Sequence, residues 1–156
     1  MTAYLMAKEK KDMSEIRDFK ARFGSPESFR VYAGCMYRPT AERFTQVAND
    51  LKNRRGVSIF ACLDAGKVQG IIAVEEAGRK TAVILGIAVD AAFRRNGIGR
   101  RLIAGTAARL DLGMLTAETD DDAVCFYRRC GFQTVTFEKT FGHEVCRRYR
   151  CTLRLR

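Results

Sequence analysis

The sequence is poor in metal-binding patterns, with a single histidine, His143, and no Cys-x-x-Cys pair. Zinc sites are built from closely spaced cysteine and histidine ligands, so we expect no metal at the functional site. The chain has 6 cysteines, but it is long and rich in core residues compared with a disulfide scaffold. We therefore predict free thiols at these positions: Cys35, Cys62, Cys125, Cys130, Cys146 and Cys151.

Long apolar runs are also absent. The opening MTAYLMAKEKK holds no signal-peptide core, and no later stretch reaches the roughly 20 apolar residues of a membrane span. The chain has only 2 prolines, and no repeat or Gly/Ser/Pro-rich linker divides it. We expect one domain over residues 1–156, located in the cytoplasm.

Acidic residues are fewer than basic ones. The chain has 28 lysines and arginines and 18 aspartates and glutamates, which gives a net charge of +10. A basic surface attracts nucleic acid, acidic membranes and anionic small molecules alike. The charge alone does not choose among these partners, and keeping the protein soluble is an equal alternative.

The middle of the chain predicts strands. Residues 57–64 and 68–76 are apolar runs joined by the turn AGK, which is typical of a hairpin. Residues 81–89 are continuously apolar, so we predict a central strand buried on both faces. Gly86 interrupts this strand; it indicates a bulge or a close backbone approach, or it is an accident of packing.

The N-terminal third is less regular. We predict a strand at residues 3–8, a helix from about Asp12, and irregular structure over residues 24–38. A further helix begins near Thr40 and stops at Gly56. The helix at Asp12 rests on helical spacing of these apolar residues: Ile16, Phe19 and Phe23.

The C-terminal third predicts a strand at 114–119, a helix at 121–130, and strands near 132–139 and 144–155. The last strand alternates apolar residues with arginines, so we expect one core face and one solvated face. We interpret its arginines as solvated residues of an edge strand rather than a nucleic-acid patch.

The most informative segment, Arg94 to Arg100, follows the apolar strand and opens a helix through about Leu110. The first N–H groups of a helix have no internal partner and lie at its positive end, so they bind phosphate. Gly97 and Gly99 leave these amides accessible, and the arginines add positive charge. A G-x-G turn alone is also typical of an ordinary strand-to-helix turn. The chain lacks the dinucleotide GxGxxG in a first βα unit and the GxxxxGK[ST] P-loop.

Two motifs together resemble the GNAT N-acetyltransferase superfamily. Val89 and the run from Arg94 to Gly99 match its [Q/R]-x-x-G-x-[G/A] motif, and Asp120 to Phe132 match N-x-x-A-x-x-[F/L]-Y-x-x-x-G-F. The resemblance implies an α/β fold of the α+β, mixed-sheet kind. Its single domain would hold a central, mostly antiparallel sheet splayed between strands 4 and 5 and flanked by helices.

The resemblance also implies a site for acetyl-CoA, with pantetheine along the fourth strand and pyrophosphate on the loop. Asp120 departs from the family's usual Asn; it can only accept hydrogen bonds, and capping the next helix is an equal alternative. The implied cofactor-binding residues are Ile87, Ala88, Val89, Arg94, Arg95, Asn96, Gly97, Ile98, Gly99, Arg100, Asp120 and Tyr127.

Tyr127 matches the family tyrosine that protonates the departing thiolate, so we predict it as the general acid; a core aromatic is the alternative. Glu118 is a candidate general base, in competition with Glu75, Glu76, Asp90 and deprotonation through water. A route through an acyl-cysteine at Cys125 or Cys130 is a minor alternative, because these cysteines are expected in the core. His143, in the last hairpin, is either near the acceptor or solvated.

We therefore expect an acetyl-CoA-dependent N-acyltransferase that moves an acetyl group directly to a primary amine of a small molecule or protein. The alternative is a catalytically inactive GNAT-like module that binds CoA or nucleic acid. Residues 24–38, with Phe29, Tyr32, Met36 and Tyr37, are the expected acceptor-side wall. We expect no membrane or nucleic-acid partner, and a homodimer stays open; the sequence does not assign the acceptor.

Overall fold

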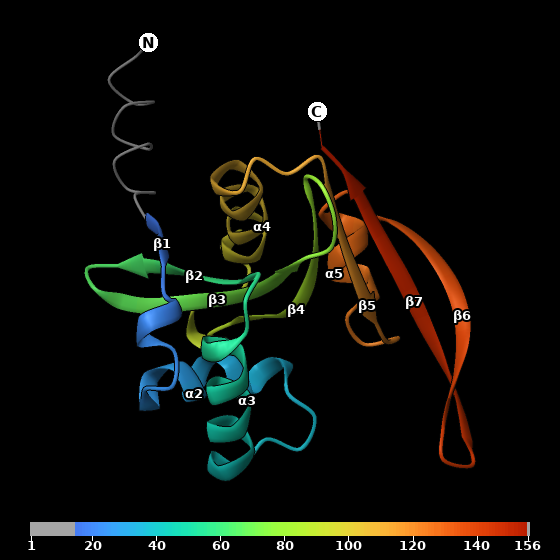
Figure 1. The fold of residues 1–156 in the computed structure, drawn as a ribbon, viewed down its shortest axis with the longest axis horizontal. Helices are drawn as coiled ribbons and strands as arrows, with labels where there is room; N and C mark the ends of the chain where they lie inside the picture. Colours follow the sequence, from blue (N-terminus) through green and yellow to red (C-terminus); the bar gives the residue numbers. More distant parts are fainter. Residues whose placement is uncertain (1–14, 156) are drawn as a thin grey trace.

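The computed structural model describes residues 15–155, so the strand predicted at residues 3–8 lies outside the described residues. These residues form a 7-stranded sheet in the order β1-β2-β3-β4-β5-β7-β6 (Figure 1). Neighbouring strands are antiparallel except β4 and β5, which are parallel. The strands are β1 (Glu15–Asp18), β2 (Val57–Asp64), β3 (Lys67–Glu76), β4 (Thr81–Val89), β5 (Met114–Thr119), β6 (Gln133–Phe141) and β7 (Glu144–Arg154).

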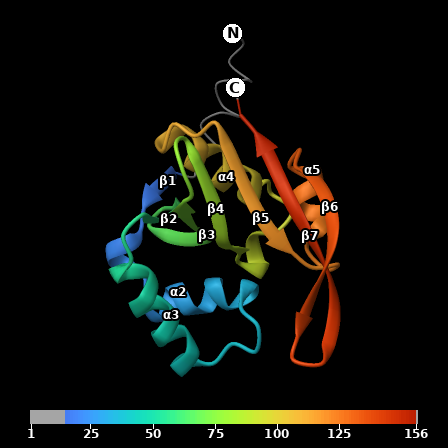
Figure 2. The same ribbon diagram turned by 45° about the vertical axis from the view of Figure 1, so that its right-hand side comes forward.

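Helices cover the two faces of the sheet unequally. In Figures 1 and 2, α2 and α3 lie on one side of β2 to β4, and α4 lies on the other. The α-helices are α2 (Pro26–Tyr32), α3 (Ala41–Asn53), α4 (Ile98–Arg109) and α5 (Val124–Arg129), and three short 3-10 turns are η1 (Lys20–Arg22), η2 (Ala33–Cys35) and η3 (Ala91–Phe93). Within residues 15–155, none of the helices is long and apolar enough to cross a membrane.

Two hydrophobic clusters follow from this arrangement. One joins α4 and α5 to the sheet and includes Ile72 and Leu102; the other joins α2 and α3 to the opposite face and includes Ile71 and Phe44. Neighbouring residues of a strand point to opposite faces, so Ile71 and Ile72 of β3 belong to different clusters. The predicted mixed α/β fold is confirmed.

The N-terminal expectations were partly wrong. The helix predicted from about Asp12 begins outside the described residues, and from Glu15 onward the chain forms β1 followed by η1, with Ile16 paired with Cys62 of β2. The segment expected to be irregular contains α2, whose N-cap Ser25 accepts a hydrogen bond from the Ser28 amide at 3.2 Å. A proline follows the cap at the first helical position, where its missing N–H costs nothing. The helix near Thr40 is confirmed as α3.

The last strand lies inside the sheet, contrary to its expected place at an edge. β7 pairs with β5 on one side and β6 on the other, so β6 is the edge strand. Tyr149 and Cys151 of β7 are buried as expected, but Val145 is exposed because that end of the strand pairs only with β6. Beyond β5, the two strands continue as a ribbon that projects from the body (Figure 1).

The central strand β4 contains the irregularity that Gly86 indicated. Ala73 of β3 pairs with Gly86, but the next residue, Val74, pairs with Ile84, so Leu85 is an extra residue in β4. The bulge changes which face of the sheet the following side chains point to. Ile84 and Ile87, which would lie on opposite faces of a regular strand, therefore contact the same cluster. The expected burial on both faces is wrong at the bulge itself, where Leu85 is 38% exposed.

Candidate active site

The strand ladder between β4 and β5 stops early. The two strands pair only from Thr81 to Val83 of β4, opposite Met114 to Thr116 of β5. Beyond that point β4 still pairs with β3, and β5 with β7, but no described strand lies along the edge of β4 that faces β5. This is the predicted splay between the fourth and fifth strands. It leaves this edge of β4 without a strand partner in the middle of the sheet, where an extended ligand can pair with its backbone.

Gly86 lies at this splay, in close contact with η2 and the end of α2. A Cβ atom added to Gly86 would lie 2.7 Å from Cζ of Tyr32 and 3.0 Å from Sγ of Cys35, and it would also collide with the Tyr32 hydroxyl. Side chains do not tolerate such distances, so this position requires glycine. The close approach anticipated for Gly86 is therefore present, together with the bulge.

The predicted phosphate loop places the N-terminus of α4 at the end of β4. Gly97 is the N-cap residue with a φ of 74°, and no side chain caps the helix. The φ value favours glycine, and the missing cap leaves the first backbone N–H groups available to an anion. The positive end of the helix dipole lies at the same point.

Gly99 has a packing role that the sequence did not indicate. It is buried, and an added Cβ would lie 2.7 Å from Cε2 of Phe126 on α5. The glycine therefore allows α5 to pack against α4. Of the two loop glycines, Gly97 has open space around its missing side chain, with no atom within 4 Å.

The arginines of the loop point in different directions. Arg94 donates from Nε to the carbonyl oxygen of Val89 at 3.4 Å, and its guanidinium lies beside Gly34 of η2. Arg100 donates to the carbonyl oxygen of Arg129 at 2.8 Å, at the C-terminus of α5. Arg95, with a φ of 68°, is exposed. Arg94 thus links the loop to the α2 side, and Arg100 links α4 to α5.

Asp120 stabilises the turn that precedes α5. Its Oδ1 accepts hydrogen bonds from the amides of Asp122 at 3.0 Å and Ala123 at 3.2 Å. This turn explains why α5 begins at Val124, later than predicted. Asp120 is therefore not the N-cap of the helix, which is Ala123, and a contact of Asp120 with a ligand stays a prediction.

Tyr127 projects from α5 into the cluster beside the splay. The residue is 6% exposed, and its ring packs edge-on against Phe126 and Phe132 at centroid distances of 5.2 Å. Burial raises the pKa of its hydroxyl above the ordinary value, and the nearby thiols of Cys151 and Cys35 add to this effect. The hydroxyl is therefore protonated at neutral pH and can act as a proton donor.

Glu118 of β5 is held by two cations from the β6–β7 ribbon. Its Oε1 lies 3.0 Å from Nζ of Lys139 and 3.4 Å from Nε of Arg148. Desolvation raises the pKa of Glu118, but the hydrogen bonds and charges of Lys139 and Arg148 outweigh it, so the net shift is downward. A lower pKa makes the carboxylate a weaker base.

Two of the three competing carboxylates, Asp90 and Glu75, are engaged elsewhere. Asp90 accepts a hydrogen bond from the Ala92 amide, which lowers its pKa, and it forms an ion pair with Arg30. Glu75 pairs with Arg54 at 3.3 Å, on the β2 side of the sheet.

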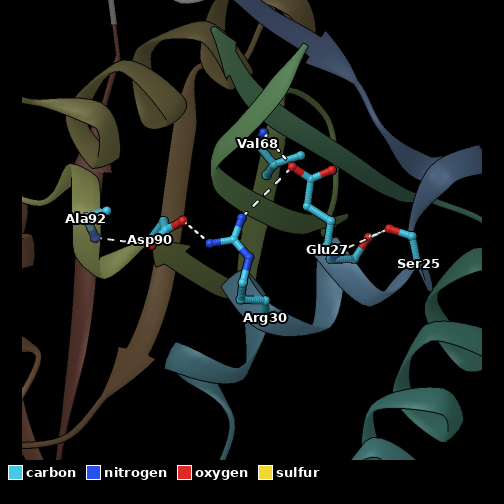
Figure 3. A network of polar contacts seen from close by, with 7 residues as sticks. Ser25, Glu27, Arg30, Val68, Asp90 and Ala92 are labelled. Carbon is cyan, nitrogen blue, oxygen red and sulfur yellow. Dashed lines mark hydrogen bonds and ion pairs between the residues drawn. The ribbon is translucent and has the colours of Figure 1, made fainter. Parts of the chain in front are cut away.

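Sequence reasoning placed Tyr32 only within a broad acceptor-side wall, and treated Cys35 as an ordinary thiol. Their position is set by α2, which two polar contacts attach to the sheet (Figure 3). Oε1 of Glu27 accepts a hydrogen bond from the Val68 amide at 3.0 Å, and Arg30 pairs with Asp90 at the end of β4. The useful signal was Ser25-Pro26, a cap followed by an N1 proline.

Residues 55–134 match the family model described as "Acetyltransferase (GNAT) domain". This match spans β2 through the start of β6, which includes the splay, the phosphate loop and Tyr127. The chain therefore belongs to the GNAT acetyltransferase family, and it is an N-acetyltransferase by class. A comparison with curated protein sequences finds no match.

Solved structures show the same fold at low sequence identity. The ribosomal-protein-S18-alanine N-acetyltransferase from Escherichia coli is 18% identical with a TM-score of 0.70, over 91% of this chain and 94% of that one. A GNAT family acetyltransferase from Elizabethkingia anophelis with acetyl-CoA bound is 17% identical with a TM-score of 0.66, over 92% and 99%. The IAA acetyltransferase from Bacillus cereus is 19% identical with a TM-score of 0.63, over 90% and 99%.

Proposed function

We propose that the chain transfers the acetyl group of acetyl-CoA directly to a primary amine of a small molecule or a protein. The observation that supports this most is the unpaired edge of β4, which is followed in the chain by η3, the loop and the uncapped N-terminus of α4. Pantetheine carries two amides and can add to a strand edge as a peptide does. A pyrophosphate suits the first amides of a helix.

In this proposal each part of the donor has its own element. The backbone of Ile87, Ala88 and Val89 binds the pantetheine arm. The loop and first turn of α4 bind the pyrophosphate through backbone amides, with Arg95 adding charge from its exposed position. Asp120 accepts from a pantetheine amide only with a lone pair that its two bonds to backbone amides leave over.

The reaction then needs one proton donor beside the leaving sulfur. The neutral amine attacks the thioester carbonyl, a tetrahedral intermediate forms, and the C–S bond breaks. Tyr127 gives its proton to the departing thiolate and regains one from solvent. Its position in the motif and beside the splay supports this role; burial keeps the hydroxyl protonated at neutral pH, and the same raised pKa makes it a weaker acid.

The proton of the attacking amine leaves through water in this proposal. Glu118 is the alternative acceptor of this proton. It lies near the end of β5, but its two cation partners lower its pKa and so make it a weaker base. Glu118→Gln should therefore reduce kcat by less than about 10-fold, below the range of a dedicated general base.

The experiment is a panel of amines with acetyl-CoA, read as thiol released from CoA. The panel holds small primary amines, peptides with a free α-amino group and peptides with a lysine. At least one class should release thiol in proportion to enzyme. CoA binding without thiol release from any amine would favour a module that binds CoA without catalysis; no binding at all would contradict the proposal entirely.

A further inference from the structure

Two side chains with a hydroxyl and a thiol, Tyr32 and Cys35, lie on the α2 side of the splay. Neither has a role in the acetyl transfer proposed above. Tyr32 ends α2, and Cys35 ends η2, three residues later. Both fill the volume that a side chain at Gly86 would occupy. The sulfur of Cys35 also lies near the backbone of Ile87, on the edge of β4 where a thioester would lie.

The Tyr32 ring is held firmly, and Cys35 contacts the backbone of the same residue. The Tyr32 ring is 4% exposed and packs edge-on against Phe23 at 5.0 Å. Cys35 donates from Sγ to the carbonyl oxygen of Tyr32 at 3.2 Å. Because α2 is attached to β3 and to the end of β4 through Glu27 and Arg30 (Figure 3), the Tyr32 ring cannot withdraw without moving the helix.

An acyl-CoA bound as proposed would place its acyl end against Tyr32 and Cys35. Its pyrophosphate lies on α4, on one side of the sheet, whereas α2 lies on the other (Figure 2). A chain that passes from one side to the other between β4 and β5 presents its far end to the α2 side. For acetyl-CoA, that far end is the acyl group.

We propose that Tyr32 and Cys35 form the wall against which the acyl group of the donor lies, and that this wall restricts the donor to acetyl. The inference rests on the proposed function, because it assumes that acyl-CoA binds along β4. Cys35 is the adjustable part, since it sits in a short exposed turn, whereas the Tyr32 ring belongs to the core.

Cys35 acts here as a neutral surface rather than as a nucleophile. The residue as a whole is exposed, but its sulfur is directed toward Tyr32 and Gly86, and desolvation there raises the pKa of the thiol to about 12. At neutral pH the thiolate, which would be the attacking species, is scarcely populated. A thiol is close in size and polarity to a methyl group, so it suits an apolar wall.

The test is the affinity of CoA, acetyl-CoA, propionyl-CoA and butyryl-CoA, measured by titration calorimetry, for the wild type, Cys35→Ala and Cys35→Val. The wild type should bind butyryl-CoA at least about 10-fold more weakly than acetyl-CoA, as expected for a pocket that rejects extra methylenes. Cys35→Ala should remove most of this difference. Cys35→Val should weaken acetyl-CoA by about 10-fold and leave CoA unchanged.

Cys125→Ala and Cys125→Val are the matched controls, because Cys125 is also exposed but lies on α5, away from η2. Both should keep the wild-type order of affinities. Equal affinity of the wild type for acetyl-CoA and butyryl-CoA would overturn the inference, and so would a Cys35→Ala variant with unchanged selectivity. A wild type that does not bind CoA would instead contradict the proposed function. Failure of this inference and failure of the proposed function are therefore distinguishable.

Discussion

The two halves of the sheet differ in how they are covered. The half from β1 to β4 lies between helices on both faces, and Ile71 and Ile72 of β3 are both 0% exposed. In the half formed by β5, β7 and β6, α5 covers one face, and Val135 of β6 is 65% exposed. The first half supplies most of the burial that stabilises the fold. The second leaves one face open beside the splay.

The candidate site lies at the boundary between these halves because only there does a sheet contain free strand edges in its interior. β4 belongs to the covered half, and its bulge and Gly86 direct it away from β5. β5 belongs to the open half and keeps its pairing with β7. Substitutions in the first half should therefore change stability, and those at the boundary should change activity.

Tyr127→Phe should give the largest effect on activity. It removes the hydroxyl and keeps the ring that packs against Phe126 and Phe132. We expect kcat to fall by about 10²–10⁴-fold, the range of general acid catalysis, with little change in acetyl-CoA affinity. The loss should shrink with a thioester whose leaving thiol is more acidic. Normal turnover in a chemistry-limited assay, with lower thermal stability, would assign Tyr127 to the core alone.

Substitutions in β3 and β6 should separate the two halves by stability. Ile72→Ala removes a fully buried side chain, so urea unfolding should show a loss of about 2–5 kcal/mol. Val135→Ala, on the exposed strand, should cost less than about 0.5 kcal/mol. Similar losses for the two variants would show that the β6 side is as tightly built as the β3 side.

The contact between α2 and the end of β4 should appear in the pH dependence of stability. The Ala92 amide and Arg30 lower the pKa of Asp90 in the folded state, so this contribution is present above the ordinary aspartate pKa of about 4. It is lost as the pH falls through the lower folded value. Asp90→Asn should cost about 1 kcal/mol at pH 7 and show a smaller further loss between pH 4 and pH 2. A wild-type acid profile in this variant would contradict the role given to Asp90.

Arg150→Ala should have the smallest effect. Arg150 is exposed and lies 5.0 Å over the ring of Phe137, at a distance in sequence and structure from α4. We expect acetyl-CoA affinity within about twofold of the wild type, the usual range for a surface change. A large loss in calorimetry would mean that the anion site extends over β7, and the comparison between the halves would need to be redrawn.

Much of the boundary could be predicted from sequence because its signals are local. The apolar run of β4, the loop up to Gly97 and the motif around Tyr127 each carry their information within a few residues, and the structure contains the expected elements at each of them. The predicted family is confirmed by the match over residues 55–134.

The remaining features depend on contacts between segments distant in the chain. Gly86 requires glycine because of Tyr32, and Gly99 because of Phe126; a sequence read one segment at a time shows neither partner. The place of β7 inside the sheet follows from strand order, which alternation along one strand does not encode. The prediction of a helix from about Asp12 was wrong after Glu15, because a strand followed by a 3-10 turn can place apolar residues at the same spacing as a helix.

The most direct test of the account is CoA binding by Gly97→Glu compared with Gly66→Glu. Both glycines have positive φ values, 74° and 80°, and a Cβ at either would meet no atom within 4 Å, so the two substitutions are matched in φ and in local space. Only Gly97 lies at the N-terminus of α4; Gly66 lies in the turn between β2 and β3.

At a CoA concentration of 100 times Kd, the wild type and Gly66→Glu should be stabilised by about 2.7 kcal/mol, measured as the shift in thermal unfolding with and without CoA. Gly97→Glu should show no shift, because its carboxylate takes the place of the pyrophosphate at the helix terminus. A folded Gly97→Glu variant with the full CoA shift would contradict the assignment of the α4 terminus and the splay as the acetyl-CoA site.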